Sequence, residues 1–190
     1  MTKRMAVYCG AATGNDPAFK EATVLLGEWL VANNYDLIYG GGGVGLMGIL
    51  AETVLTKGGK AYGIMPQNLV ERGAAYEGLT NLQVVPNMSI RKQAMLNQAD
   101  VCIALPGGPG TLEEIIEAFS WARLGDNSNP CLFFNVKDYY TPLQGFLKAM
   151  TDKGFLTVTD FDKIGFIEHL DELAPFIAAY TPPRVRQYEH

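Results

Sequence analysis

The sequence has no cluster of lysines and arginines, and its acidic residues outnumber its basic ones. Among 190 residues there are 15 Lys and Arg against 20 Asp and Glu, which gives a formal net charge of −5. A protein that binds nucleic acid in bulk needs a positively charged surface to neutralise phosphates. We therefore expect no nucleic-acid partner, and any phosphate must be held locally by backbone amides and a few cations.

Cysteine and histidine are also scarce. Cys9, Cys102 and Cys131 stand singly in or at the end of apolar runs, and the two histidines are His169 and His190. This scattered set forms neither a disulfide framework nor a metal-ligand pattern, and it is typical of reduced thiols in a cytosolic protein. No apolar run is long enough to span a bilayer, and no signal peptide precedes the first predicted strand. We expect a cytoplasmic protein with no membrane partner and no metal.

Short apolar runs alternate with longer amphipathic segments along the chain. The short runs predict strands at 5–9, 36–39, 60–64, 82–85, 101–105, 131–135 and, more weakly, 163–166. The longer segments predict helices at 17–33, 46–57, 88–98, 111–124, 139–153 and 168–180. This alternation predicts an α/β fold, with a mainly parallel sheet covered by helices on both faces. We expect one domain over 1–181 and a tail over 182–190, with 67–78 as a polar loop near the site.

Three glycine-rich turns, at 10–14, 40–48 and 107–110, each follow a predicted strand. In an open parallel sheet, the loops after the carboxyl ends of the strands surround the ligand. The three turns therefore predict a shared pocket for a nucleotide or a phosphate. None is a P-loop, because no Gly-Lys-Ser/Thr closes it. The second contains a G-x-G-x-x-G-like pattern, but no acidic residue ends the next strand, which disfavours NAD.

The most informative segment is PGGPGTLEE at 106–114. Its glycines let backbone N–H groups approach an anion, and we expect Thr111 to open a helix whose N-terminus adds partial positive charge. A phosphate site is therefore predicted at 107–111. We expect Glu114 in the first turn of that helix, where it would repel an anion if binding were the only task. A carboxylate beside a phosphate site indicates that the site catalyses a reaction next to the phosphate.

Arg91 and Lys92 lie in the first turns of the helix predicted upstream of this segment, where positive charge is unfavourable for the helix dipole. They are either a solvated surface pair, or one of them reaches a phosphate or a ribose. Arg91 is the better candidate, because its planar guanidinium binds oxyanions at two points. Met47, Met88 and Met95 either line an apolar slot for a base or fill the core.

Together these motifs resemble those of the LONELY GUY family, the cytokinin riboside 5′-monophosphate phosphoribohydrolases, whose members are often misnamed lysine decarboxylases. The segment 106–114 is similar to PGGxGTxxE, 41–48 to GGGxxGLMG, and 88–92 to MxxRK. Later landmarks at 121–125 and at Asn135 with Tyr139 and Tyr140 are also similar. The resemblance implies a Rossmann-like fold and a homodimer or larger homo-oligomer with sites near the interface. It also implies hydrolysis of the N-glycosidic bond of a nucleoside 5′-monophosphate to free base and ribose 5-phosphate.

Matched by position, the resemblance implies that Arg91 and Glu114 are the catalytic pair. The expected substrate-binding residues are Gly42, Gly43, Gly45, Met88, Lys92, Gly107, Gly108, Gly110 and Thr111. The sequence departs from the family at Ala11-Ala12, where Ser-Ser is usual, at Ser89-Ile90, where many members have His-Glu, and at Arg123, where Gln is usual. These departures leave open whether the base is a cytokinin, adenine or both.

Cleavage of a ribosyl C–N bond develops positive charge on the sugar in the transition state. A nearby carboxylate stabilises that charge and can orient or deprotonate the attacking water, and Glu114 fits this role. The 5′-phosphate positions the sugar, and Arg91 binds the phosphate, binds the ribose or assists the leaving base. This mechanism needs no cofactor. The alternative function is a non-catalytic nucleotide-binding or molybdenum-cofactor-binding protein of the same superfamily, which has no use for a carboxylate beside the phosphate.

Overall fold

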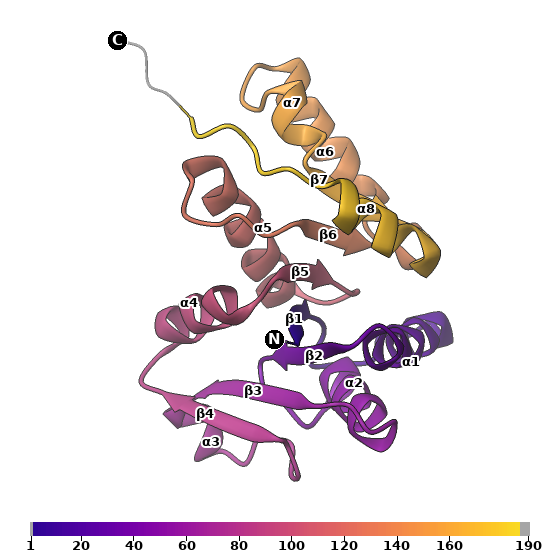
Figure 1. The fold of residues 1–190 in the computed structure, drawn as a ribbon, viewed down its shortest axis with the longest axis vertical. Helices are drawn as coiled ribbons and strands as arrows, with labels where there is room; N and C mark the ends of the chain where they lie inside the picture. Colours follow the sequence, from indigo (N-terminus) through magenta and orange to yellow (C-terminus); the bar gives the residue numbers. More distant parts are fainter. Residues whose placement is uncertain (1, 187–190) are drawn as a thin grey trace.

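The computed structural model describes residues 2–186, and within them it shows one seven-stranded sheet with helices on both faces (Figure 1). Every pair of neighbouring strands is parallel, which confirms the predicted α/β fold class. The strands are β1 (Lys3–Tyr8), β2 (Tyr35–Tyr39), β3 (Ala61–Pro66), β4 (Asn81–Val85), β5 (Val101–Ala104), β6 (Cys131–Phe134) and β7 (Ile164–Ile167).

Helices fill most of the connections between these strands. They are α1 (Pro17–Ala32), α2 (Gly45–Thr56), α3 (Gln67–Val70), α4 (Met88–Gln98), α5 (Pro109–Leu124), α6 (Thr141–Asp152), α7 (Val158–Phe161) and α8 (Leu173–Ala179), with 3₁₀ turns η1 (Val136–Asp138) and η2 (Leu170–Glu172). None of the helices in the described part of the chain is both long and apolar enough to cross a membrane.

The order of the strands fixes where a ligand can bind. Across the sheet the order is β4-β3-β2-β1-β5-β6-β7, so the chain builds outward from β1 and then returns to start again at β5. In sheets of this kind, ligands bind outside the carboxyl ends of the strands at the reversal point. Tyr8, the last residue of β1, pairs in register with Ala104, the last residue of β5. The glycine turns that follow these two strands therefore leave the sheet side by side.

Two hydrophobic cores cover the two faces of the sheet. Side chains alternate along β1, so Met5 and Val7 enter one core while Ala6 and Tyr8 enter the other. The first core includes α1, α2 and α8, and the second includes α4, α5 and α6. Because both faces are buried there, the inner strands β5 and β6 are continuous apolar runs in the sequence, whereas the edge strand β4 is partly polar and mostly exposed.

Helix α5 begins two residues earlier than predicted. Gly108 is its N-cap and Pro109 is its first residue, a position that suits proline because no N–H partner is needed there. Thr111 is consequently the third residue of the helix, and Glu114 lies in the second turn instead of the first. The prediction for Glu114 was wrong by one turn, which moves its carboxylate away from the amides at the helix N-terminus.

Other differences are smaller. The segment 67–78 was predicted as a loop, but it contains the single turn of α3, and α7 was not predicted. The helix predicted at 168–180 is shorter: η2 precedes it, and α8 begins at Leu173 with Pro175 in its first turn. Of the predicted tail, 182–186 has no helix or strand, and 187–190, which includes His190, lies outside the described residues.

Candidate functional site

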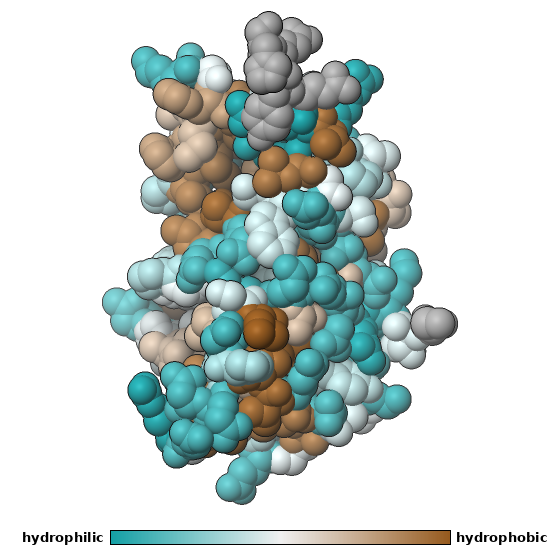
Figure 2. All heavy atoms as spheres, turned by 90° about the vertical axis from the view of Figure 1, so that its left-hand side faces the viewer, coloured by the Kyte–Doolittle hydropathy of each residue, from teal (hydrophilic) through white to brown (hydrophobic). Residues whose placement is uncertain are grey.

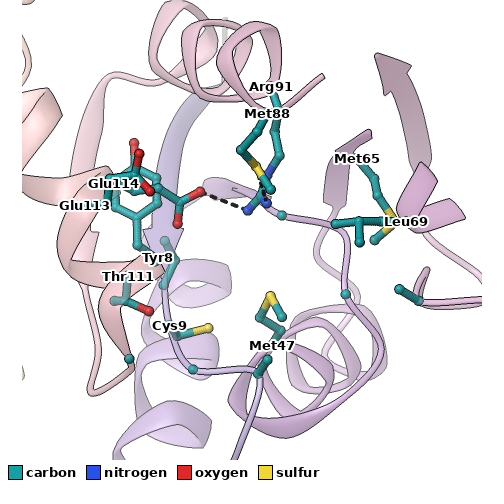
Figure 3. A pocket seen from close by; sticks show the side chains of 18 of the residues that line it. Tyr8, Cys9, Met47, Met65, Leu69, Met88, Arg91, Thr111, Glu113 and Glu114 are labelled. Carbon is teal, nitrogen blue, oxygen red and sulfur yellow. Dashed lines mark hydrogen bonds and ion pairs between the residues drawn. The ribbon is translucent and has the colours of Figure 1, made fainter. Parts of the chain in front are cut away.

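A cavity of about 410 Å³ opens at the carboxyl ends of β1, β2 and β5 (Figure 3). It lies at the reversal of strand order and has the size of a typical small-molecule site. Its charged side chains come from two helices, α4 and α5. They are Arg91, Lys92, Glu113 and Glu114.

Arg91 and Glu114 point toward one another at one side of this cavity, as Figure 3 shows. Arg91 Nη2 lies 2.9 Å from Glu114 Oε1, and the two side chains are only 11% and 12% exposed. The expected catalytic residues therefore form a mostly buried ion pair, although they are 23 positions apart. They meet because α4 and α5 both cover the same face of the sheet.

Burial dominates the electrostatics of Glu114. Removal from water raises the pKa of this carboxyl, the positive charge of Arg91 lowers it, and the neighbouring Glu113 raises it again. The net pKa lies above the usual value for a glutamate. A carboxyl shifted toward neutral pH is suited to exchange a proton with water or substrate.

The guanidinium of Arg91 lies against the backbone of Gly40, and any Cβ at Gly40 would collide with Nη2. Nη1 is 3.1 Å from the sulfur of Met88, a weak acceptor. Nε is buried and has no hydrogen-bond partner within residues 2–186. A buried unpaired donor is unusual in a protein, and this one belongs to a residue that lines the cavity.

Lys92 lies in an ion-pair cluster between α4 and α5. Its Nζ is 2.7 Å from Glu113 Oε1 and 2.8 Å from Glu117 Oε2, and the side chain is 13% exposed. Hydrogen bonds to these two carboxylates raise the pKa of Lys92. Lys92 lines the cavity, but its charge is already neutralised by the protein.

The predicted phosphate site lies at one end of the cavity. Gly108, Gly110 and Thr111 line it, whereas Gly107 lines a neighbouring cavity of about 390 Å³. In the part of the chain that the structure describes, the amides of these four residues have no acceptor. The N-terminus of α5 therefore presents free N–H donors, as an anion site requires.

The glycines before α2 divide into two groups. Gly42 lines the cavity, while Gly43 and Gly45 do not. The amide of Gly43 donates to Ala74 at 2.9 Å, and Gly45 packs against the backbone of Ala11. That Gly43 and Gly45 help to hold substrate stays a prediction, and their observed contacts are with the protein itself.

We expect Gly45→Ala to destabilise the fold. Gly45 has a φ of +61°, and a Cβ there would overlap the backbone of Ala11. The free energy of unfolding, measured by urea denaturation, should fall by about 1–3 kcal/mol. The matched control is Gly145→Ala in α6, where a Cβ meets nothing within 4 Å and stability should stay the same or rise. Equal stability of the two variants would contradict this reading of Gly45.

The wall of the cavity near α2, α3 and α4 is apolar. Met47 and Met88 line it, as one of the two sequence interpretations required, but Met95 is fully buried in the core. Sequence reasoning missed Met65 and Leu69. Met65 follows the rule that ligand contacts gather where strands end, and Leu69 lies in the segment that was predicted to lie near the site.

Cys9 and Tyr8 also line the cavity and were not predicted as site residues. Burial raises the pKa of the Cys9 thiol, which keeps it protonated and a poor nucleophile. Within residues 2–186, no group of three or more His, Cys, Asp or Glu is arranged to hold a metal ion. That the protein needs no metal or cofactor stays a prediction.

Comparison with known proteins finds one matching family model and several similar enzymes that share one name. The family model described as possible lysine decarboxylase matches residues 47–177. The cytokinin riboside 5′-monophosphate phosphoribohydrolases LOG1 and LOG7 of Arabidopsis thaliana are 38% and 42% identical, over 95% of this chain and 84% and 83% of theirs. A probable enzyme of the same name from Oryza sativa subsp. japonica, LOGL2, is 38% identical over 95% of this chain and 74% of its own.

Solved structures show the same fold at lower identity. The molybdenum cofactor binding protein from Rippkaea orientalis has a TM-score of 0.72 at 17% identity, covering 94% of this chain and 97% of that one. The DNA processing protein A from Helicobacter pylori has a TM-score of 0.56 at 16% identity, covering 94% and 82%. At these identities the likeness concerns the fold alone.

Proposed function

This chain belongs to the LONELY GUY family of cytokinin riboside 5′-monophosphate phosphoribohydrolases, and from that membership we propose that it hydrolyses the N-glycosidic bond of a nucleoside 5′-monophosphate. The products are the free base and ribose 5-phosphate. One observation carries the proposal: the buried pair of Arg91 and Glu114 lies in the same cavity as the free amides at the start of α5.

The amides near Gly108 and Thr111 hold the 5′-phosphate. The sugar then lies between these amides and the ion pair of Arg91 and Glu114. As the C1′–N bond breaks, positive charge grows on the sugar, and the Glu114 carboxylate stabilises it. Glu114 also orients the water whose oxygen forms the new bond to C1′ and accepts its proton. The departing base leaves with the electrons of the broken bond and takes up a proton from solvent, and Glu114 returns the proton of the water to solvent, so that one water molecule is consumed in all.

Arg91 lines the cavity, where it could contact this substrate. Its Nη2 already holds Glu114 in place, and its buried Nε–H has no partner within residues 2–186. Phosphate, ribose and leaving base are the three possible partners of this guanidinium. The apolar wall that includes Met47, Met65 and Met88 supports a place for the flat face of the base.

The geometry does not support decarboxylation of lysine, the activity in the description of the family model. Enzymes of that chemistry commonly use a lysine that forms a Schiff base and therefore needs a lowered pKa. Lys92 is the lysine that lines the described cavity, and its pKa is raised by Glu113 and Glu117. A carrier function is also disfavoured. A buried carboxylate beside an anion site weakens binding of the anion, and in a protein that catalyses no reaction it would have no compensating role.

The direct test is incubation of the purified protein with AMP and, separately, with isopentenyladenosine monophosphate. Free base is followed by chromatography and ribose 5-phosphate by a coupled assay. We expect both products in equal amounts from at least one substrate. Binding of both nucleotides without release of base would contradict the hydrolase and favour the carrier.

The rate should depend on the ionisation of Glu114. Its pKa is raised, so the carboxyl takes up a proton at a higher pH than an ordinary glutamate does. As the pH falls through that value, the carboxylate is lost and kcat/KM should fall with it. The acid limb of the kcat/KM profile should therefore have a pKa above the ordinary glutamate value of about 4.3. A limb at or below that value would argue against Glu114 as the essential ionised group.

We also propose a homodimer or larger homo-oligomer with sites near the interface. An apolar groove between α5 and α6 supports it, with Leu112, Phe146 and Phe155 exposed by 38%, 61% and 79%. Figure 2 shows brown hydrophobic side chains gathered in the upper part of the face, at the level of these helices. Light scattering coupled to size-exclusion chromatography measures the assembly directly, and a monomer would contradict this proposal.

We further propose that 1–181 form one domain with 182–190 as a tail, and that the protein works in the cytoplasm. The single sheet that runs from β4 to β7 supports the first statement. The free and buried thiols of Cys9, Cys102 and Cys131 support the second.

A further inference from the structure

The carbonyl groups of the glycine turn after β5 are all occupied by protein donors. Four carbonyls in succession accept hydrogen bonds: Leu105 from the Tyr140 hydroxyl at 2.7 Å, Pro106 from the Gly10 amide at 3.1 Å, Gly107 from the Tyr139 hydroxyl at 2.6 Å and Gly108 from the Leu112 amide at 3.2 Å. The turn thus directs its acceptors into the protein and leaves its N–H donors free. This division is what an anion site needs, because a carbonyl oxygen facing a phosphate would repel it.

The bond from Tyr139 has a particular geometric consequence. The peptide between Gly107 and Gly108 is trans, as are the others in the described chain, so its C=O and N–H point in opposite directions. A hydroxyl that holds the Gly107 carbonyl on one side therefore directs the Gly108 N–H to the other. Gly107 and Tyr139 line the neighbouring cavity, and Gly108 lines both that cavity and the site.

Within the described residues, the bond from Tyr139 is the one hydrogen bond that this peptide itself makes. Glycine lies on both sides of it, and although Gly107 packs closely against Thr111 and Gly10, Gly108 has no such neighbour. A Cβ placed on Gly108 would meet no atom within 4 Å, which shows that the space around it is open. If the peptide turned over, the Gly107 carbonyl would face the anion and the Gly108 donor would be lost.

Tyr139 is held in place at some conformational cost. The two preceding residues, Lys137 and Asp138, have φ values of 52° and 59°, a left-handed conformation that non-glycine residues adopt rarely. The ring of Tyr139 packs edge-on against Phe19, with 5.6 Å between ring centroids. The side chain is nevertheless 43% exposed, so the core does not depend on it. Strained backbone of this kind is found most often at functional sites.

We propose that Tyr139 is a positioning residue of the phosphate site, whose hydroxyl fixes the peptide between Gly107 and Gly108 so that the Gly108 N–H faces the 5′-phosphate. This inference rests on the proposed function for the identity of the anion. Tyr140 provides the natural comparison. Its hydroxyl binds Leu105, but the next residue is Pro106, which has no N–H to direct.

The test compares Tyr139→Phe with Tyr140→Phe, each of which removes one hydroxyl and keeps the ring. Affinity for ribose 5-phosphate is measured by titration calorimetry, and stability by thermal unfolding. We expect Tyr139→Phe to bind about tenfold more weakly, the effect of one lost hydrogen bond, with an unchanged melting temperature. Tyr140→Phe should lower the melting temperature, because it leaves the buried Leu105 carbonyl unpaired, and should keep the affinity.

Two results would overturn the inference: an affinity of Tyr139→Phe within twofold of the unmodified protein, or an equal loss in both variants. Failure of the unmodified protein to bind ribose 5-phosphate would overturn it as well. The proposed function is tested separately by release of base from AMP. A protein that binds ribose 5-phosphate through Tyr139 but releases no base would retain this inference and lose the hydrolase.

Discussion

Glu114→Gln should lower turnover by at least about a thousandfold, the scale expected when a group that stabilises transition-state charge is removed. The amide has nearly the shape of the carboxylate but carries no negative charge, and it cannot accept a proton from water. Binding of the monophosphate should be largely kept, because the amides of α5 are untouched. Initial rates of base release measure the first effect, and titration with AMP measures the second.

Glu113→Gln is the matched control for this change. Glu113 is the adjacent residue on α5, it also lines the cavity, and its side chain is 60% exposed and paired with Lys92. Its loss should change the rate only a few-fold, because the Glu113 carboxylate is mostly exposed and Lys92 keeps its bond to Glu117. A near-normal rate in Glu114→Gln would show that the assignment of Glu114 is wrong. Equal losses of rate in the two variants would show that activity depends on the total negative charge of Glu113 and Glu114, and not on the Glu114 carboxylate in particular.

Gly40→Ala should lower kcat/KM by about a hundredfold, the cost of moving a catalytic group by an ångström or so. The new methyl group collides with Nη2 of Arg91 and displaces the guanidinium from Glu114. The atom that must move is the end of a flexible side chain, so the fold should tolerate the change. Steady-state kinetics and thermal unfolding together separate these two effects.

A double-mutant cycle tests whether this effect passes through Arg91. In an Arg91→Met background the guanidinium is absent, and Gly40→Ala should then cost almost nothing further. If the two substitutions instead lower kcat/KM by independent factors, the alanine acts on the glycine turn that follows β2 and not through displacement of the guanidinium.

The fold follows from the sequence because its periodicities are strong. Strand β5 and the part of β1 from Met5 onward are continuous apolar runs, and α4 was predicted at the same residues that the structure shows. The errors occur where local signals compete. Pro109 was assigned to the turn before α5, yet proline is favoured at the first position of a helix, and this one starts it.

The candidate site was harder to predict, because contacts between helices do not follow from spacing. Resemblance to a family singled out Arg91 and Glu114, but only the packing of α4 beside α5 shows that their side chains meet. Lys92 is the residue next to Arg91, yet its side chain pairs with two other carboxylates, those of Glu113 and Glu117. Gly43 and Gly45 carry no side chain, so nothing in the sequence indicates whether they face substrate or the protein backbone.

The charged groups that line the cavity are two cations, Arg91 and Lys92, and two anions, Glu113 and Glu114. Their formal charges cancel, and the whole chain is negative by five. A dianionic nucleotide approaching through solvent therefore meets no long-range attraction, and its encounter is not electrostatically steered. Under the proposed function, recognition would therefore depend on short-range contacts, including the main-chain dipoles at the start of α5. Capture of substrate would gain nothing from long-range attraction, so added salt should not slow it.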